Sequence, residues 1–201
     1  MKDDVASIIS LYERHADAFC RDRGRGPWVE QAWLQRFLAY LPASAHVLDI
    51  GCGCGVPMAA FLIERGVELS GVDSSARMIA LCRARFPRQH WQVADMREME
   101  PGRSFDGLLA WDSFFHLDQA SQRAMFACFA RLANPGAMLM FNSGARQGTA
   151  VGRYCGEPLY HASLALEEYR MLLRGHGFTV LHHVTEDPDC GQRTVWLARR
   201  L

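Results

Sequence analysis

The hydrophobic pattern of the chain changes at about Ala45. Before that point, apolar residues three and four positions apart predict an amphipathic helix from Val5 to Phe19 and a second helix over residues 28–41. The polar segment "RDRGRGP" separates the two. From Ala45 onward, short apolar runs typical of buried strands alternate with helical patterns. The pattern therefore predicts two helices followed by an alternating α/β region.

This alternation predicts a doubly wound sheet. The predicted strands are 46–50, 68–73, 90–95, 105–112, 137–143, 179–184 and 193–199. The predicted helices between them are 57–66, 75–86, 118–133 and 166–178. Such alternation favours a mostly parallel sheet with helices on both faces. We expect a single α/β domain over residues 1–201, with residues 1–43 as an N-terminal helical cap segment and residues 44–201 as the core.

The stretch "VLDIGCGCGVP", residues 47–57, places three glycines directly after the first predicted strand. Glycine has no Cβ and tolerates positive φ, so the backbone there can turn sharply and lie against a ligand beside a helix N-terminus. In a parallel sheet, ligands bind beyond the carboxyl ends of the strands. The stretch therefore predicts a nucleotide-type site. A G-x-G-x-x-G dinucleotide fingerprint would need glycine at the position of Val56.

The pattern D-x-G-x-G-x-G from Asp49 to Gly55 resembles the first motif of class I S-adenosylmethionine-dependent methyltransferases. Further motifs fall in register with it. "GVD" ends the second predicted strand at Asp73, and "VADM" ends the third at Asp95 and Met96. "FDGLLAWDSFFHL" is similar to the family's fourth motif, and "LANPGAMLMF" to its turn and fifth strand.

The resemblance implies a Rossmann-like, seven-stranded sheet whose last strand, 193–199, is antiparallel. It also implies S-adenosyl-L-methionine as the cofactor and methyl transfer to a small-molecule acceptor by in-line displacement. Such an enzyme mainly aligns the acceptor with an already activated methyl group. Two other classes stay open. One is a non-catalytic sensor or scaffold that binds the cofactor, and the other is a nicotinamide-dependent oxidoreductase, which Val56 disfavours.

The resemblance assigns cofactor contacts to the strand ends. It implies that Asp49 lies at the methionine end of the cofactor and that Asp73 accepts the ribose hydroxyls. Asp95 and Met96 would hold the adenine. The full set of cofactor-binding candidates is Asp49, Gly51, Cys52, Gly53, Gly55, Asp73, Ser74, Asp95, Met96, Trp111 and Asp112.

Several of these residues also have a purely structural interpretation. Asp73 is suited to cap the helix that follows it, and Asp95 is suited to a turn. Asp49 can be a buried acid paired with backbone amides. Trp111 is either a wall against the sulfonium of the cofactor or an aromatic residue of the core.

Seven cysteines are scattered over the chain, namely Cys20, Cys52, Cys54, Cys82, Cys128, Cys155 and Cys190. With no sign of export in the sequence, we expect reduced thiols. Cys52 and Cys54 lack the Cys-x-x-Cys spacing of a metal pair, so we expect no metal site. We interpret both as small packing residues. The alternative is a Cys54 thiol activated by the helix N-terminus.

Two segments outside the sheet are expected to contact the acceptor. The first is the helical cap, with Tyr12, His15, Trp28 and Trp33 as candidates. The apolar spacing of Tyr12 and Trp33 gives core packing as their alternative. The second is the segment of about twenty residues at 143–163, predicted to be a substrate loop or lid, because long loops in compact domains are usually functional.

The catalytic candidates are His116, Tyr160 and His161. His116 follows the fourth predicted strand, and the ordinary histidine pKa of about 6.5 suits a general base. Tyr160 and His161 are expected to contact the substrate, and Glu157 is the remaining candidate. The structural alternatives are a packed His116 and a solvated His161.

Charge and hydropathy limit the partners. The 22 basic and 22 acidic residues balance, so no overall field attracts nucleic acid or an anionic membrane. The segment "MKDDVASIIS" has acids where a signal peptide carries positive charge, and no apolar run approaches the roughly 18 residues of a membrane span. We therefore expect a cytoplasmic protein with a small-molecule acceptor, no nucleic-acid partner and no membrane partner.

Overall fold

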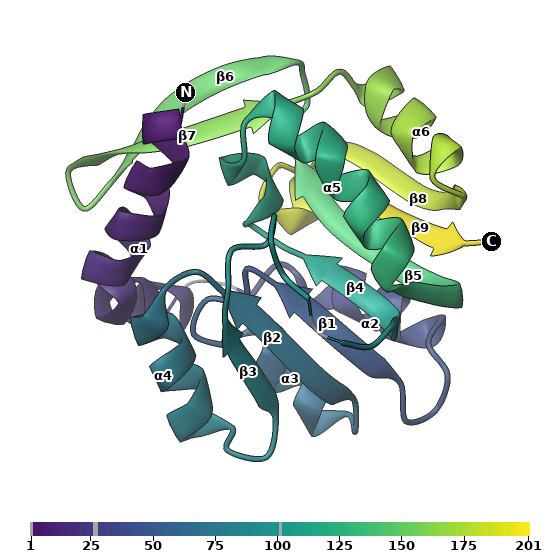
Figure 1. The fold of residues 1–201 in the computed structure, drawn as a ribbon, viewed down its shortest axis with the longest axis horizontal. Coiled ribbons are helices and arrows are strands. Elements are labelled where there is room, and N and C mark those ends of the chain that lie inside the picture. Colours follow the sequence, from purple (N-terminus) through teal and green to yellow (C-terminus); the bar gives the residue numbers. More distant parts are fainter. Residues whose placement is uncertain (1, 26–27, 101) are drawn as a thin grey trace.

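The structure is a computed structural model that describes residues 2–25, 28–100 and 102–201. Within these residues, seven strands form one sheet in the order β3-β2-β1-β4-β5-β9-β8 (Figure 1). They are β1 (His46–Ile50), β2 (Glu68–Asp73), β3 (His90–Val93), β4 (Phe105–Ala110), β5 (Ala133–Ser143), β8 (Phe178–Asp187) and β9 (Arg193–Arg200). Two further strands, β6 (Gly148–Tyr154) and β7 (Glu157–Ser163), pair only with each other.

The seven-stranded sheet is parallel except for its last strand in sequence. Strand β1 pairs in parallel with β2 and β4, and the parallel pairing continues from β2 to β3 and from β4 to β5. Strand β9 runs antiparallel to both of its neighbours, β5 and β8. The mostly parallel sheet and its antiparallel last strand, both predicted from the sequence, are confirmed.

Helices cover both faces of the sheet, as predicted. The helices are α1 (Lys2–Arg23), α2 (Gln31–Ala39), α3 (Met58–Glu64), α4 (Ala76–Arg85), α5 (Gln119–Leu132) and α6 (Leu166–Gly175). Helices α2, α3 and α4 contribute to one hydrophobic cluster and α5 and α6 to another. The central strands β1 and β4 lie between the two clusters, so their residues are apolar on both faces.

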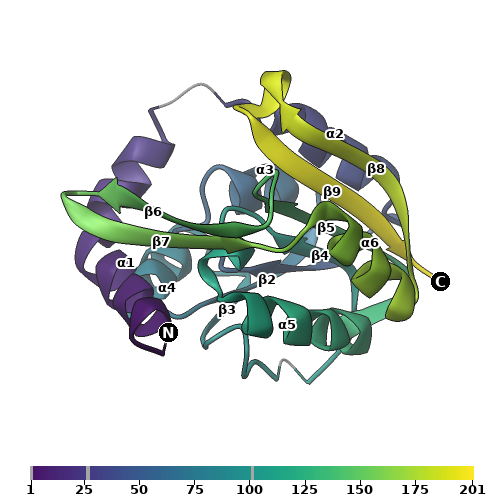
Figure 2. The same cartoon turned by 90° about the horizontal axis from the view of Figure 1, so that it is seen from above.

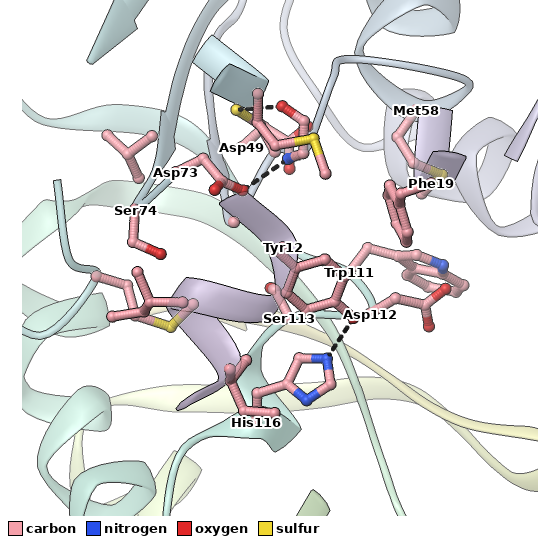
Figure 3. A pocket seen from close by; sticks show the side chains of 18 of the residues that line it. Tyr12, Phe19, Asp49, Met58, Asp73, Ser74, Trp111, Asp112, Ser113 and His116 are labelled. Atoms are coloured by element: carbon pink, nitrogen blue, oxygen red, sulfur yellow. Dashed lines mark hydrogen bonds between the residues drawn. The ribbon is translucent and has the colours of Figure 1, made fainter. Parts of the chain in front are cut away.

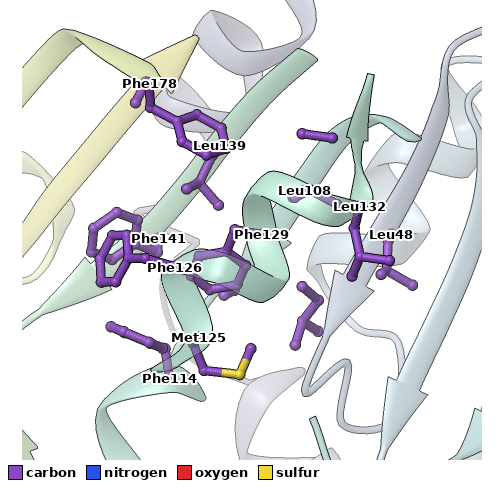
Figure 4. Close-up of a cluster of buried hydrophobic side chains, with 14 of the residues drawn as sticks. Leu48, Leu108, Phe114, Met125, Phe126, Phe129, Leu132, Leu139, Phe141 and Phe178 are labelled. Carbon is purple, nitrogen blue, oxygen red and sulfur yellow. The ribbon is translucent and has the colours of Figure 1, made fainter. Parts of the chain in front are cut away.

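Aromatic side chains dominate the cluster beneath α5 (Figure 4). The ring of Phe114 lies 5.4 Å from that of Phe141 and 5.7 Å from that of Phe129, in edge-on and tilted arrangements that aromatic pairs prefer. Phe114 begins the short 3-10 helix η1 (Phe114–His116) that follows β4. This packing therefore fixes the segment that carries His116.

The N-terminal helices do not form one cap, and the expectation for residues 1–43 is corrected in this respect. Helix α2 buries Trp33 and Phe37 against the sheet. A Cβ on Gly107 of β4 would lie 2.7 Å from the Phe37 ring, so glycine allows this close approach. Only α1 lies along the carboxyl-end edge of the sheet, beside α4 and β7 (Figures 1 and 2). It bends at His15, where φ is −107° and ψ is 15°.

The segment at 143–163, predicted to be an irregular loop, is mostly a β-hairpin. Strands β6 and β7 pair antiparallel, with Tyr154 opposite Glu157. Cys155 and Gly156 form the two-residue turn with φ values of 49° and 82°. Positive φ at both central residues defines the turn that suits tight hairpins. The prediction of a loop missed this turn because the sequence lacks the usual Asn-Gly or Asp-Gly signal.

One expectation for the cysteines is wrong. Cys20 of α1 and Cys54 of the glycine loop form a disulfide, with Cα atoms 6.0 Å apart. The bond joins residues 34 positions apart that only the course of α1 brings together. The remaining cysteines are free thiols, as expected: Cys52, Cys82, Cys128, Cys155 and Cys190.

Candidate active site

A pocket lies at the carboxyl ends of β1, β2 and β4, against α1 (Figure 3). It holds about 910 Å³ of space, part of it open to solvent. This is the edge at which open α/β sheets bind ligands. Most of the predicted cofactor-binding residues line it: Asp49, Gly51, Cys52, Gly53, Asp73, Ser74, Asp95, Met96, Trp111 and Asp112.

The glycine loop forms the floor of the pocket. The backbone N–H groups of Gly51 and Cys52 both donate to the carbonyl of Val72, at 2.8 and 3.0 Å, which folds the loop back onto β2. Gly51 has a φ of 76°, and a Cβ there would lie 2.3 Å from the Cβ of Ser113. Only glycine fits this position. Gly53 also has positive φ, at 52°, and lines the pocket.

Gly55, the remaining cofactor candidate, lies outside the pocket. Its φ is 77°, and a Cβ there would approach the Phe86 ring to 3.1 Å and the Cys82 sulfur to 3.3 Å. This glycine therefore allows the loop to pack against α4 and the turn after it. Contact between Gly55 and a cofactor stays a prediction.

The carboxylate of Asp73 connects the glycine loop to the start of α4. One oxygen accepts a hydrogen bond from the Gly53 N–H and the other from the Ser75 N–H, both at 2.9 Å. The N-cap of α4 is Ser75, whose hydroxyl accepts from the Met78 N–H. Asp73 therefore does not cap the helix itself. Burial raises the pKa of Asp73 above its ordinary value, and the residue lines the pocket.

Asp49 places a second carboxylate on the pocket wall. Its side chain is 2% exposed, and no described residue donates a hydrogen bond to it. Burial, reinforced by the negative charge of Asp73, raises the pKa of Asp49 to about 7. The alternative of an acid paired with backbone amides is therefore not what the structure has. A buried carboxylate without a partner favours a cationic group of a ligand.

Asp95 and Met96 line the pocket after β3. One Asp95 oxygen accepts hydrogen bonds from the backbone N–H and the Nε of Arg97, each at 2.9 Å. Asp95 is thus a turn acid as well as a lining residue. Contact between these two residues and adenine stays a prediction.

Asp112 is part of a buried charge network. Its carboxylate accepts two hydrogen bonds from the Arg193 guanidinium, at 2.9 and 2.8 Å, and one from Asn142 at 2.6 Å. Burial would raise the pKa of Asp112, but Arg193 and Arg23 lower it below its ordinary value. The φ of Asp112 is 48°, an unusual conformation that these bonds hold in place. Its carboxylate is therefore largely committed to the protein.

Trp111 combines both of its sequence interpretations. It belongs to the hydrophobic cluster beneath α2 and α3, and it also lines the pocket (Figure 3). Its indole N–H is buried without a hydrogen-bond partner among the described residues. The side chain is thus both part of the core and a wall of the site.

His116 and Tyr12 meet across the pocket (Figure 3). His116 Nδ1 lies 2.8 Å from the carbonyl oxygen of Tyr160, which can only accept, so Nδ1 carries the proton. Nε2 then accepts from the Tyr12 hydroxyl at 3.0 Å. Burial lowers the pKa of His116 to about 4 and raises that of Tyr12 above its ordinary value. Both groups are therefore neutral near pH 7.

The other catalytic candidates lie behind this pair. Tyr160 touches it through its backbone carbonyl, and the His161 ring stacks on His116 with centroids 4.9 Å apart. Neither residue lines the pocket. Glu157 accepts hydrogen bonds from Arg14 and His15 of α1. The structure thus places Tyr160 and His161 in support of His116, and Glu157 in the contact between the hairpin and α1.

Sequence reasoning did not predict two arginines at or beside the pocket, and the remaining cap candidates do not line it. Arg23 lies in the last turn of α1, lines the pocket and pairs with Glu30 at 2.8 Å. Arg193, at the start of β9, holds Asp112. Arg193 has no sequence signal because its partner Asp112 is distant in the chain, and no motif marks Arg23. The side chains of Trp28 and Trp33 do not line the pocket.

The described residues contain no group of three or more histidine, cysteine or acidic side chains that could hold a metal ion. No helix among them is long and apolar enough to cross a membrane.

Residues 47–136 match the model of a methyltransferase domain, and the antiparallel last strand is the one expected from the resemblance. Residues 47–136 therefore resemble a methyltransferase domain, and the described residues share the Rossmann-like fold of solved methyltransferases that hold S-adenosylmethionine or S-adenosylhomocysteine.

Individual relatives agree with this class. An O-methyltransferase of Pyrenophora dematioidea is 27% identical over 151 residues, which cover 69% of this chain and 56% of that protein. The chain thus spans little more than half of that relative. A trans-aconitate 2-methyltransferase of Azoarcus sp. is 39% identical over 72 residues, or 35% of this chain and 28% of that one.

Solved structures share the fold at low sequence identity. A 1,6-didemethyltoxoflavin-N1-methyltransferase of Burkholderia thailandensis, with bound S-adenosylhomocysteine, has a TM-score of 0.76 at 20% identity and covers 97% of this chain and 88% of its own. CalS10, an S-adenosylmethionine-bound amino pentose methyltransferase of Micromonospora echinaspora, has a TM-score of 0.71 at 21% identity, covering 92% and 96%.

Proposed function

We propose that the protein is a methyltransferase that binds S-adenosyl-L-methionine in this pocket and methylates a small molecule. The observation that carries the proposal is the buried carboxylate of Asp49, which accepts no hydrogen bond from the described residues, beside a floor of glycines. S-adenosylmethionine carries a sulfonium and an ammonium group, and such cations offset the cost of a buried carboxylate. The alternative is a sensor that binds the cofactor without catalysis. Such a sensor would not need the pair that His116 and Tyr12 form.

Each part of the cofactor has residues that fit it. Gly51 and Gly53 leave room for a ligand against the loop backbone, and Asp49 would attract the cationic methionine end. Asp73 would accept the ribose hydroxyls, while Asp95 and the backbone of Met96 would hold the adenine. Ser74, Cys52 and Trp111 would complete the walls.

When bound, the cofactor supplies a methyl group that its sulfonium already activates. The protein then needs to orient the acceptor and exclude water. Ile8, Ile9 and Phe19 of α1 give the pocket an apolar side, which favours an uncharged small molecule. The Tyr12 hydroxyl and His116 Nε2 lie at this side and would orient the acceptor atom that receives the methyl group.

The role of His116 follows from its neutral state. With a pKa of about 4 it is a weak base, so we infer that it orients the acceptor hydrogen and takes up the proton only as transfer proceeds. The proton would pass to Nε2 directly or through Tyr12. Tyr160 keeps Nε2 available by fixing the proton on Nδ1. His161 would support the His116 ring by stacking on it.

The proposal includes no nucleic-acid or membrane partner, in line with the balanced charge of the chain. The cytoplasmic location also stays a proposal. In such a reducing compartment disulfides are mostly transient, so the Cys20–Cys54 bond would be reversible there.

Calorimetry tests the cofactor assignment. S-adenosylmethionine and S-adenosylhomocysteine should each bind at one site, and NADH should not bind. Asp73→Asn should weaken binding by roughly 1.5 to 3 kcal/mol, the usual size of a charged hydrogen bond. Asp106→Asn is the matched control, because Asp106 lies at the opposite end of the sheet, in β4. Saturable NADH binding without any response to the sulfonium cofactor contradicts the proposal.

A further inference from the structure

Helix α1 is attached to the core by the Arg23–Glu30 pair, by the hydrogen bond between Tyr12 and His116, and by exposed ion pairs. Its ion pairs with α4 and β7 join Asp17 to Arg77 and Arg14 to Glu157, and these side chains are between 36% and 55% exposed. Exposed pairs of this kind contribute little to stability. The apolar cluster beneath its second half is small, and its fully buried members are Ala16, Cys54 and Met78.

The same helix forms one side of the pocket. The lining residues that it supplies are Ile8, Ile9, Tyr12, Phe19 and Arg23. Figure 1 shows α1 alongside α4 and β7. The position of α1 therefore determines how far the pocket is closed.

A single disulfide fastens this helix to the floor of the pocket. Cys20 lies in the last turns of α1, and Cys54 lies in the glycine loop between Gly53 and Gly55. Among the described residues, this bond is the only disulfide. It connects α1, which forms one side of the pocket, to the loop that would contact the cofactor.

We propose that the Cys20–Cys54 pair is a redox switch that controls cofactor binding. The disulfide holds α1 closed over the pocket, and its reduction releases α1. This inference rests on the proposed function, because the ligand that it regulates is S-adenosylmethionine or its demethylated product. The co-reactant is a low-molecular-weight disulfide such as oxidised glutathione.

The surroundings of the two sulfur atoms determine which cysteine reacts first with the small disulfide. Cys20 is partly exposed, and the Arg85 guanidinium lies 3.4 Å from its sulfur, a neighbour that favours the thiolate. Cys54 is 1% exposed. The Cys20 thiolate therefore attacks the small disulfide first, breaking its S–S bond and releasing one thiol. Cys54 then attacks the Cys20 sulfur and releases the second thiol.

Electrons and protons balance in this thiol–disulfide exchange. The two cysteine thiols are oxidised to one protein disulfide, and one molecule of oxidised glutathione is reduced to two thiols. The two protons lost by the cysteines are taken up by the two released thiolates. Treatment with excess reduced thiol runs the same steps backward.

Binding and oxidation should be reciprocally coupled. If the closed position of α1 favours both the disulfide and the cofactor, oxidation must raise cofactor affinity by the same factor by which the cofactor favours the disulfide. We expect this factor to be about fivefold or more, within the range usual for coupled sites. Cofactor binding alone, without any methyl transfer, therefore shifts the equilibrium from the two thiols toward the disulfide.

The test compares the oxidised and the reduced wild-type protein. Mass spectrometry after alkylation defines the redox state, and calorimetry gives the Kd of S-adenosylhomocysteine for each form. We expect tighter binding by the oxidised form by about fivefold or more. In glutathione buffers, saturating S-adenosylhomocysteine should shift the Cys20–Cys54 equilibrium toward the disulfide by the same factor.

Two variants complete the test. Cys20→Ser should bind like the reduced protein under both conditions, whereas Cys128→Ser, which changes a cysteine on α5, should respond like the wild type. Equal Kd values for the two wild-type forms overturn the switch and leave the proposed function standing. Failure to form the Cys20–Cys54 bond in oxidised glutathione overturns it equally. Absence of binding by both forms overturns the switch and the proposed function together.

Discussion

The hydroxyl oxygen of Tyr12 lies 3.0 Å from Nε2 of His116, although 104 residues separate the two in sequence. Tyr12 comes from α1 and His116 from η1, directly after β4. The acceptor side of the pocket is therefore assembled only when α1 lies against the sheet edge. This contact links the position of α1 to the proposed orientation of the acceptor.

Replacing Tyr12 tests this link. Tyr12→Phe keeps the ring but removes the hydroxyl, so an acceptor should be less well oriented and turnover should fall by roughly tenfold to a hundredfold. Affinity for S-adenosylhomocysteine, measured by calorimetry, should change by less than about twofold because the cofactor contacts remain. Tyr40→Phe is the control, since Tyr40 bonds to His182 at the surface. Equal turnover of Tyr12→Phe and wild type would remove Tyr12 from the mechanism.

His116 gives a prediction about pH. With a pKa of about 4 it should show no protonation step in the turnover profile between about pH 6 and pH 8. His116→Ala should lower turnover by about a hundredfold across this range while leaving cofactor affinity unchanged. The measurement is initial rate against pH with an identified acceptor. A step near the ordinary histidine pKa that vanishes in the variant would show instead that His116 titrates as an ordinary base.

Asp49 should make cofactor binding depend on pH. Its pKa is about 7 in the ligand-free protein, and a cationic ligand favours the carboxylate, so binding should release a proton. Affinity for S-adenosylmethionine should therefore fall as the pH decreases below about 7. Asp49→Asn should bind more weakly near pH 8 and lose this dependence, as measured by calorimetry. A pH dependence identical in both proteins would mean that another group is responsible.

The same carboxylate should cost stability in the absence of ligand. Its pKa rises from an ordinary value of 3.8 to about 7 on folding, so the folded chain binds more protons in this window and stability falls as the pH rises through it. Asp49→Asn should raise the free energy of unfolding near pH 8 by an amount on the order of a few kcal/mol, and by much less near pH 4. Urea unfolding at both pH values measures the difference.

Replacing Arg193 should lower the free energy of unfolding more than replacing other arginines. Arg193→Ala leaves the partly buried carboxylate of Asp112 without its main cation and removes a second cation near the buried Glu30, and loss of one partner of a buried pair typically costs up to about 3–5 kcal/mol. Arg146→Ala, at an exposed position, should change stability by less than about 0.5 kcal/mol. Comparable urea midpoints for the two variants would contradict this role of Arg193.

The sheet and the cofactor side of the site could be predicted because they depend on local patterns. The alternation of apolar strands and amphipathic helices determines a parallel sheet, and the carboxyl ends of its strands meet at one edge. Asp49, Asp73 and Asp95 each end or closely follow a strand, so their convergence on the pocket follows from the topology. Gly55 packs closely against Phe86, a role that spacing in the sequence does not distinguish from ligand contact.

The side of the site that α1 forms could not be predicted because it depends on long-range packing. The apolar spacing of α1 and α2 is alike, yet α2 packs on the sheet and α1 on its edge. The contact between Tyr12 and His116 and the bond between Cys20 and Cys54 both follow from that placement. The hairpin turn at Cys155 is another case, since its positive φ is set by strand pairing and not by the usual turn residues.

The most direct test of the central claim is a labelled transfer experiment. The purified protein is incubated with a metabolite extract and S-adenosylmethionine that carries a trideuterated methyl group, with the Tyr12→Phe, His116→Ala double variant as control. Mass spectrometry should find a small-molecule product with one labelled methyl group, formed in step with S-adenosylhomocysteine and strongly reduced in the control. Absence of any labelled product, from a folded protein that also fails to bind S-adenosylhomocysteine, would contradict the assignment as a methyltransferase.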